Sequence, residues 1–230
     1  MKADTRFRFI LILVFLTAFC SYTYELVLAN ILSVLWGNVV LQYTITTGIY
    51  IFAMGAGAYF TPVRLNSKKV FIWIEVIISL LAIASPLLFV YFDAGSKFVS
   101  VPLCYSLIFM IGFFSGMELP LLLQVMQTET NAKDQNERAL FLDYAGMFAG
   151  GILFALILNR QFGSISVNLI LALINLGLAF ICCFYWASRE SQLRKIELPL
   201  LCTIFSTVTF GVLYNLSFYQ ELISKWIIAN

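Results

Sequence analysis

The chain contains at residues 9–35 the stretch FILILVFLTAFCSYTYELVLANILSVL, in which Glu25 is the one formally charged residue. A helix that spans a bilayer needs about 20 mostly apolar residues, so this stretch predicts a membrane span. Its polar centre, residues 21–25, favours a tilt or a local break. The whole sequence extends this conclusion, because 61% of its 230 residues are hydrophobic and 11% are charged. Water-soluble domains carry about 25% charged residues, so that class is excluded.

Six further stretches are long and apolar enough to span a bilayer, at about 39–61, 70–92, 99–127, 139–159, 165–187 and 198–219. Residues 217–230 carry apolar side chains on one helical stripe, which predicts either a short interfacial helix or an extension of the last span. The sequence therefore predicts an all-α integral membrane protein of about seven transmembrane helices, forming one polytopic domain over residues 1–230.

The distribution of positive charge predicts the orientation of these spans. Of the 14 Lys and Arg residues, 11 precede the first span or lie after the second, fourth and sixth spans. Cytoplasmic loops are enriched in Lys and Arg, so we expect a multi-pass protein of a bacterial inner (plasma) membrane with a cytoplasmic N-terminus. The net charge of +2 and the lack of a basic run argue against nucleic acid as a partner.

Composition also limits the chemistry. The sequence has no His, which removes imidazole catalysis and His-bearing metal sites. Its five Cys residues show no CxxC spacing and lie in apolar stretches, which favours buried inert thiols. We therefore expect no catalytic residue, no metal and no cofactor within these residues.

Short similarities suggest an internal repeat. Tyr24–Leu28 resembles Met117–Leu121 at an offset of 93 residues, and Phe52–Gly57 resembles Phe148–Gly151 at an offset of 96. Two repeats, 9–92 and 99–187, would each contain three spans and so lie in opposite orientations, with 198–230 forming the last span and tail. Such 3+3 inverted repeats are common in secondary transporters. The alternative is chance similarity between apolar segments.

Two acids inside predicted spans are the leading candidates for binding a substrate or an ion. Glu25 and Glu118 occupy matching places in the two repeats, and charges inside hydrocarbon are costly and usually functional. Pro120 removes a backbone hydrogen bond to Gly116 and favours a kink beside Glu118. The alternative is that both acids are protonated and join helices through hydrogen bonds.

Further candidates are less distinctive. Asp143 and Tyr144 lie near the predicted cytoplasmic mouth and Tyr24 precedes Glu25, but Asp143 could instead complement a helix N-terminus. We expect Glu75 to be an interfacial carboxylate. The glycine pairs with small-residue spacing predict close helix packing: they are Gly112 with Gly116, and Gly146 with Gly150.

Four motifs occur in an order that resembles a known family. They are Tyr24–Leu26, Phe52–Gly57, Gly116–Leu122 and Leu142–Gly146. Together they resemble the membrane domain of membrane-bound spermidine-synthase-like proteins, which are polyamine aminopropyltransferases fused to a membrane domain. The resemblance implies a soluble aminopropyltransferase domain after the last span. This chain ends at Asn230, and no position matches that domain's catalytic residues, so we expect this chain not to be an enzyme.

Two functions remain open. The first is an inner-membrane protein that binds or transports a small cationic solute, such as a polyamine, through intramembrane carboxylates. The second is a scaffold or anchor that transports nothing and docks a soluble or membrane protein, such as a separately encoded aminopropyltransferase. The bilayer is the expected partner in either case.

Overall fold

The computed structural model describes residues 3–62, 66–93, 97–130, 136–187, 200–205 and 207–208, and nearly all of them are helical. The helices are α1 (Ala3–Trp36), α2 (Val39–Tyr59), α3 (Ser67–Asp93), α4 (Lys97–Thr130), α5 (Asn136–Leu153), the π-helical turn η2 (Phe154–Leu158) and α6 (Asn159–Ala187). No strand occurs within these ranges. The predicted all-α class is therefore confirmed for the described residues.

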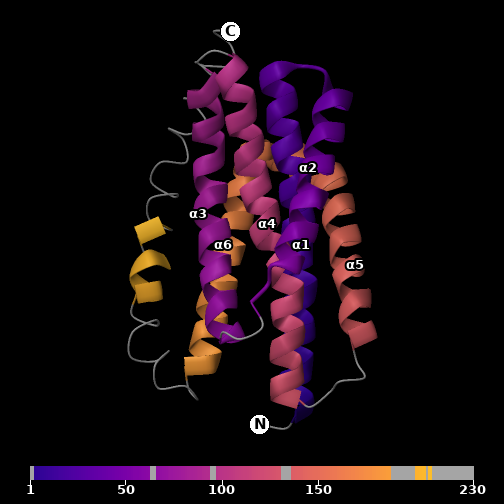
Figure 1. The fold of residues 1–230 in the computed structure, drawn as a ribbon, viewed down its shortest axis with the longest axis vertical. Helices are drawn as coiled ribbons and strands as arrows, with labels where there is room; N and C mark the ends of the chain where they lie inside the picture. The colour runs from indigo at the N-terminus through magenta and orange to yellow at the C-terminus, as the bar shows by residue number, and fades with distance from the viewer. Residues whose placement is uncertain are drawn as a thin grey trace.

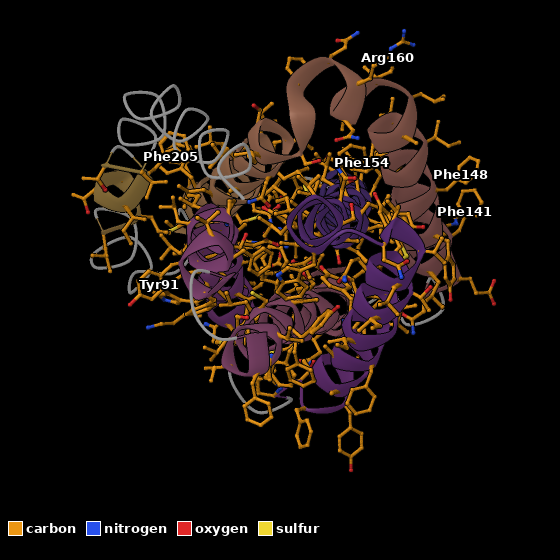
Figure 2. The ribbon with its side chains drawn as sticks, turned by 90° about the horizontal axis from the view of Figure 1, so that it is seen from above. Tyr91, Phe141, Phe148, Phe154, Arg160 and Phe205 are labelled. Atoms are coloured by element: carbon orange, nitrogen blue, oxygen red, sulfur yellow. The ribbon has the colours of Figure 1, made fainter. Side chains whose placement is uncertain are left out.

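The helices form a bundle in which successive helices run in opposite directions along the long axis (Figure 1). α1 packs against each of α2, α3, α4, α5 and α6, and Figure 2 shows it enclosed by the other helices. It continues through its polar centre without interruption, so the local break that residues 21–25 favoured is absent. We therefore expect side chains of α1 to line any cavity inside the bundle.

The turn between α1 and α2 is built from two residues that tolerate left-handed backbone. Gly37 has φ 71° and Asn38 has φ 48°. The side chain of Asn38 accepts a hydrogen bond from the backbone N–H of Leu41 at 3.2 Å, which caps the first turn of α2. Gly and Asn are the residues that adopt this conformation most readily, so the sequence itself stops α1 at this point.

The segment from Asn136 to Ala187 is helical throughout, except at Gly163, where φ is 72° and ψ is 155°. The chain reverses direction near Arg160, which lies at the outer edge of the bundle in Figure 2. A run of 52 residues would be about 78 Å long if straight, far longer than a bilayer core of about 30 Å. The reversal therefore separates the predicted fifth and sixth spans.

Five described helical stretches, counting 136–187 as one, are long and apolar enough to cross a membrane. The predicted seventh span, 198–219, and the tail lie mostly outside the described residues, where only 200–205 and 207–208 are helical. The count of seven spans and the inverted repeat are therefore not established by these helices. The membrane assignment itself fits the outer surface, where Phe141 and Phe148 are each 71% exposed (Figure 2).

An ionic cluster joins three helices at one end of the bundle. Glu129, near the end of α4, lies 3.2 Å from Nη1 of Arg6 in α1 and 2.6 Å from Nζ of Lys68 in α3. The start of α1, the start of α3 and the end of α4 therefore meet at the same end. This is the alternation that the distribution of Lys and Arg predicted for these helices.

Candidate functional site

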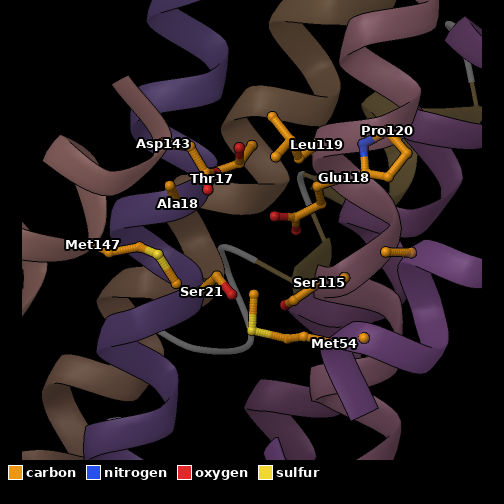
Figure 3. Close-up of a pocket in the computed structure, with 13 residues that line it drawn as sticks. Thr17, Ala18, Ser21, Met54, Ser115, Glu118, Leu119, Pro120, Asp143 and Met147 are labelled. Atoms are coloured by element: carbon orange, nitrogen blue, oxygen red, sulfur yellow. The ribbon is translucent and has the colours of Figure 1, made fainter. Parts of the chain in front are cut away.

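A cavity of about 250 Å³ lies between α1, α2, α4 and α5. Its polar lining residues are Thr17, Ser21, Ser115, Glu118 and Asp143, and the rest of its wall is apolar or glycine. Figure 3 shows these side chains arranged around the open space. A cavity that combines an apolar wall with a few convergent polar groups is the usual form of a small-molecule site.

Glu118 projects from α4 toward the cavity (Figure 3). The residue is 3% exposed, and within the described part of the chain its carboxyl group has no hydrogen-bond or ion-pair partner. A buried carboxylate without a partner is costly, and a cation that enters the cavity relieves that cost. Glu118 is therefore the strongest single feature of the site.

Asp143 lines the same cavity from α5 and lies within electrostatic reach of Glu118. Its placement differs from the expected first turn at the cytoplasmic mouth. α5 begins at Asn136, so Asp143 lies about two turns inside the helix. The field of a helix N-terminus acts mainly within the first turn, which leaves the cavity as the better account of Asp143.

Hydroxyl groups connect the cavity wall to the core of the bundle. The Tyr50 hydroxyl from α2 donates a hydrogen bond to Oγ of Ser115 at 3.2 Å and lies 3.3 Å from Oγ of Ser21. Tyr50 is fully buried, so these contacts hold α1, α2 and α4 together beside the cavity. Each serine oxygen can in addition accept a hydrogen bond from a ligand in the cavity.

Glu25 lies apart from this cavity. Its carboxyl group accepts a hydrogen bond of 2.7 Å from Oγ1 of Thr47 in α2, and Glu25 is 2% exposed. A partnered acid between two helices is what the helix-joining interpretation describes. The structure therefore pairs Glu118 with Asp143 and leaves Glu25 outside the cavity, in contact with Thr47.

Tyr24 and Glu75 occupy the core of the bundle behind Glu118. Both are 0% exposed, and each lies within electrostatic reach of Glu118. The expectation that Glu75 is an interfacial carboxylate is wrong, because α3 turns this residue inward onto α1 and α4. The position of Glu75 near the end of its helix did not predict whether its side chain faces the core or the surroundings of the bundle.

Tyr144 is 68% exposed on the outer face of α5 and does not line the cavity. Successive residues of an α-helix are about 100° apart, so a helix that turns Asp143 inward turns its neighbour away. Tyr144 thus faces the surroundings of the bundle, together with Phe141 and Phe148.

The glycine pairs of α4 and α5 lie where helices approach each other closely. A Cβ added to Gly116 would overlap the backbone of Met54 in α2, and one added to Gly112 would lie 3.0 Å from the Tyr50 carbonyl oxygen. On α5, Gly146 and Gly150 face α1 in the same way. Pro120 lies within α4 and lines the cavity one turn from Gly116, whose carbonyl oxygen loses its usual helical partner.

Sequence reasoning missed Ser21, Ser115, Tyr50 and the inward position of Glu75. Ser21 and Ser115 lie 94 residues apart, close to the repeat offset, and this spacing was a usable signal. Tyr50 had no comparable signal, because buried tyrosines occur in many apolar helices.

The oxygen atoms that line the cavity can accept hydrogen bonds from a cationic group. Within the described residues no group of three or more Cys, Asp or Glu side chains is arranged to hold a metal. Two carboxyl groups and three hydroxyl groups instead match a primary ammonium, which donates three hydrogen bonds.

Comparisons with known proteins agree with the sequence resemblance. A protein named polyamine aminopropyltransferase from Leptospira interrogans serogroup Icterohaemorrhagiae serovar copenhageni is 28% identical over 88% of this chain and 41% of its own length. Polyamine aminopropyltransferase 1 from Streptomyces coelicolor is 33% identical over 86% of this chain and 38% of its own length. Polyamine aminopropyltransferase 2 from Ralstonia nicotianae is 30% identical over 72% of this chain and 33% of its own length. No family model and no solved structure matches the chain significantly.

The chain spans about a third to two fifths of the length of these curated relatives. Their names contradict the expectation that this protein is not an enzyme, because an aminopropyltransferase is one. That expectation rested on catalytic motifs missing from a stretch that aligns with only part of each relative. The composition of a membrane-embedded stretch cannot exclude an activity of the whole protein.

The motifs therefore predicted the relationship correctly. Proteins named polyamine aminopropyltransferase cover 72–88% of the chain at 28–33% identity, and its apolar helices fit a membrane domain. This chain is homologous to part of the polyamine aminopropyltransferases and resembles their membrane domain.

Proposed function

We propose that this chain is a membrane domain that binds a small organic cation, foremost a polyamine, in the cavity between α1, α2, α4 and α5, and moves it across the bilayer. The observation that carries the proposal is Glu118, a buried carboxyl group that faces a cavity of about 250 Å³ and has no hydrogen-bond or ion-pair partner among the described residues. Asp143 supplies a second negative group to the same space.

Polyamines fit this chemistry for a physical reason. Each ammonium group needs acceptors for three hydrogen bonds, and the methylene segments between ammonium groups match an apolar wall. The cavity offers carboxyl and hydroxyl oxygens with Met54, Leu119 and Met147 beside them. The names of the relatives, which refer to polyamines, support the same class of ligand.

Transport is supported by two helix contacts that correspond to each other when residues are related by the offsets of the internal repeat. An offset of 93 relates Thr23 in α1 to Gly116 in α4, and an offset of 96 relates Met54 in α2 to Gly150 in α5. Gly116 packs against Met54, and a Cβ added to Gly150 would lie 2.7 Å from Oγ1 of Thr23. The two contacts are therefore equivalent, which is the relation that an inverted repeat would impose.

The same offsets relate the two acid sites. Glu25 corresponds to Glu118, and Thr47 corresponds to Asp143. The carboxyl group of Glu25 accepts a hydrogen bond from Thr47 and does not line the cavity, whereas Glu118 and Asp143 both line it. Glu25 is therefore the member of the pair that joins two helices, and Glu118 is the member that faces the cavity.

The test is equilibrium binding of radiolabelled spermidine to the purified protein in lipid nanodiscs, followed by uptake into proteoliposomes. We expect Glu118→Gln to weaken binding at least about tenfold, which corresponds to about 1.4 kcal/mol, and Asp143→Asn to weaken it less. Glu25→Gln is the matched control and should change binding less than either. Unchanged binding and uptake in Glu118→Gln would refute the proposal.

A second candidate function is an anchor that holds aminopropyltransferase activity at the membrane. The relatives favour it, because this chain aligns with only part of proteins that are named for the enzyme. The glycine faces lend it no support, since Gly112, Gly116, Gly146 and Gly150 already pack against α2 and α1. An anchor would show membrane-bound aminopropyltransferase activity with neither spermidine binding nor uptake by this domain, in wild type and Glu118→Gln alike.

A further inference from the structure

Glu75 is a buried acid that the cavity does not explain. It is 0% exposed, and neither of its carboxyl oxygens has a hydrogen-bond partner in the part of the chain that the structure describes. The hydroxyl group of Tyr24 is also buried without a hydrogen-bond partner among these residues, and it lies within electrostatic reach of Glu75. Buried polar groups nearly always have partners, so two such groups beside each other need a functional or structural reason.

The groups that face Glu75 come from each helix packed against α3. α1 presents Cys20 and Tyr24, α4 presents Glu118, and α6 presents Cys182. Asp143 of α5 acts on Glu118 from the far side of the cavity. Among the described residues no Lys or Arg forms an ion pair with Glu75 or Glu118. Glu118 thus lines the cavity, and Glu75 lies outside the lining but within electrostatic reach of Glu118.

We propose that Glu75 and Glu118 form a cation/proton exchange site, in which a polyamine that binds Glu118 displaces a proton held by Glu75. The inference rests on the proposed function, since it names the coupling of that same site. Two carboxyl groups that share a low-dielectric site cannot both ionise without compensating charge, so one proton stays with the empty pair. We assign this proton to Glu75, because Glu118 lines the cavity and Glu75 does not.

The exchange balances in atoms and charge. With the cavity empty, Glu118 is a carboxylate and Glu75 a neutral carboxylic acid. When a di- or polyammonium ion binds, its positive charge compensates a second carboxylate, the O–H bond of Glu75 breaks, and the proton leaves through Glu118 to water in the cavity. Tyr24 then donates a hydrogen bond to the new carboxylate. Release of the polyamine reverses each step.

The test measures protons released per spermidine bound, in weakly buffered solution with a pH-sensitive dye, using the full chain in nanodiscs. We expect wild type to release about one proton per spermidine and to bind it more weakly as pH falls, because protons compete with the cation. Glu75→Gln should keep measurable binding but lose most of the proton release and most of the pH dependence. Butylamine, with a single ammonium group, should release fewer protons than spermidine from wild type.

A matched variant separates this inference from the proposed function. Glu25→Gln removes another buried acid, and it should release as many protons as wild type. Spermidine binding by wild type without any proton release, or with equal release by Glu75→Gln, would overturn the exchange mechanism and leave the binding site standing. Failure of wild type to bind spermidine would overturn both. If Glu75→Gln does not fold, Glu75→Asp keeps the acid, and normal release by this variant would support the exchange.

Discussion

At the scale of single residues, the absence of one methyl group decides how closely two helices approach. Gly116 lies so near the backbone of Met54 that a Cβ would overlap it. Gly177 in α6 has ordinary helical backbone and no atom within 4 Å of its added Cβ. The two glycines therefore differ in packing while sharing the same local structure.

We expect Gly116→Ala to destabilise the protein by about 1–3 kcal/mol, because α2 and α4 must move apart beside the cavity. The measurement is thermal unfolding in a mild detergent, with spermidine binding as a second readout. Gly177→Ala is the control and should leave stability unchanged or slightly raised. Equal stability of Gly116→Ala and wild type would show that this contact does not limit the helix separation.

The surroundings of each side chain separate the three buried glutamates of the bundle. Glu25 has a hydroxyl partner, Glu118 has a cavity, and Glu75 has neither. All three lie in apolar stretches and are chemically identical, so their roles differ only through their neighbours. This is why variants of Glu25 serve as controls for the other two.

At the scale of elements, the reversal between α5 and α6 depends on Gly163. Its φ of 72° and ψ of 155° belong to a region that is open essentially only to glycine. Beside it, Oγ of Ser164 donates a hydrogen bond to Oδ1 of Asn159 at 2.7 Å, and Asn30 of α1 bonds both residues. The backbone of one residue and a small polar network together hold this turn on α1.

We expect Gly163→Ala to destabilise the protein by about 1–3 kcal/mol even though space for the Cβ is open. The cost comes from backbone conformation and not from a clash, so Gly163→Asn should cost less than Gly163→Val. Thermal unfolding of the three variants checks this order. Full stability of Gly163→Val would mean that the turn adopts another conformation.

At the scale of the whole molecule, the predicted orientation places Arg138 at the cytoplasmic end and Arg160 at the opposite end. The described structure supports opposite ends, because α5 and η2 separate the two residues. Both are exposed and suit labelling. Cys202 is exposed and the other four cysteines are buried. The Cys202→Ser variant therefore has no exposed thiol that would react with a labelling reagent.

In this background we expect a membrane-impermeant maleimide to label Arg160→Cys in intact cells or spheroplasts, and Arg138→Cys only after permeabilisation. The physical reason is the excess of Lys and Arg at the Arg138 end, which is retained in the cytoplasm. The Cys202→Ser parent alone should remain unlabelled. The opposite pattern would reverse the orientation of the domain.

Much of the fold could be predicted from local sequence. The predicted spans 39–61 and 70–92 agree with α2 and α3 to within a few residues at each end. The gap between the first two predicted spans contains Gly37 and Asn38, which form the first turn, and the positive charges marked the end where Arg6 and Lys68 meet Glu129. Each of these features depends on residues that are adjacent in the chain, so sequence reasoning reaches them.

The composition of the candidate site was less predictable. Glu118 and Asp143 were both candidates, but sequence similarity paired Glu118 with Glu25 instead. Tyr144 shares a motif with Asp143 and still faces outward, whereas Glu75 was placed at an interface and lies in the core. These differences arise from the rotation of each helix about its axis.

The sequence alone determined that this chain forms long apolar helices, the approximate positions of those that the structure describes, and to which proteins it is related. Backbone groups in hydrocarbon must be paired within each helix, so local composition is sufficient for that result. Only the tertiary structure decided that Glu118 and Asp143 share a cavity, that Glu25 accepts a hydrogen bond from Thr47, and that Glu75 is buried within electrostatic reach of Glu118. These relations depend on how helices from distant parts of the chain pack, because contacts at glycine backbones such as Gly116 and Gly146 fix the faces that meet.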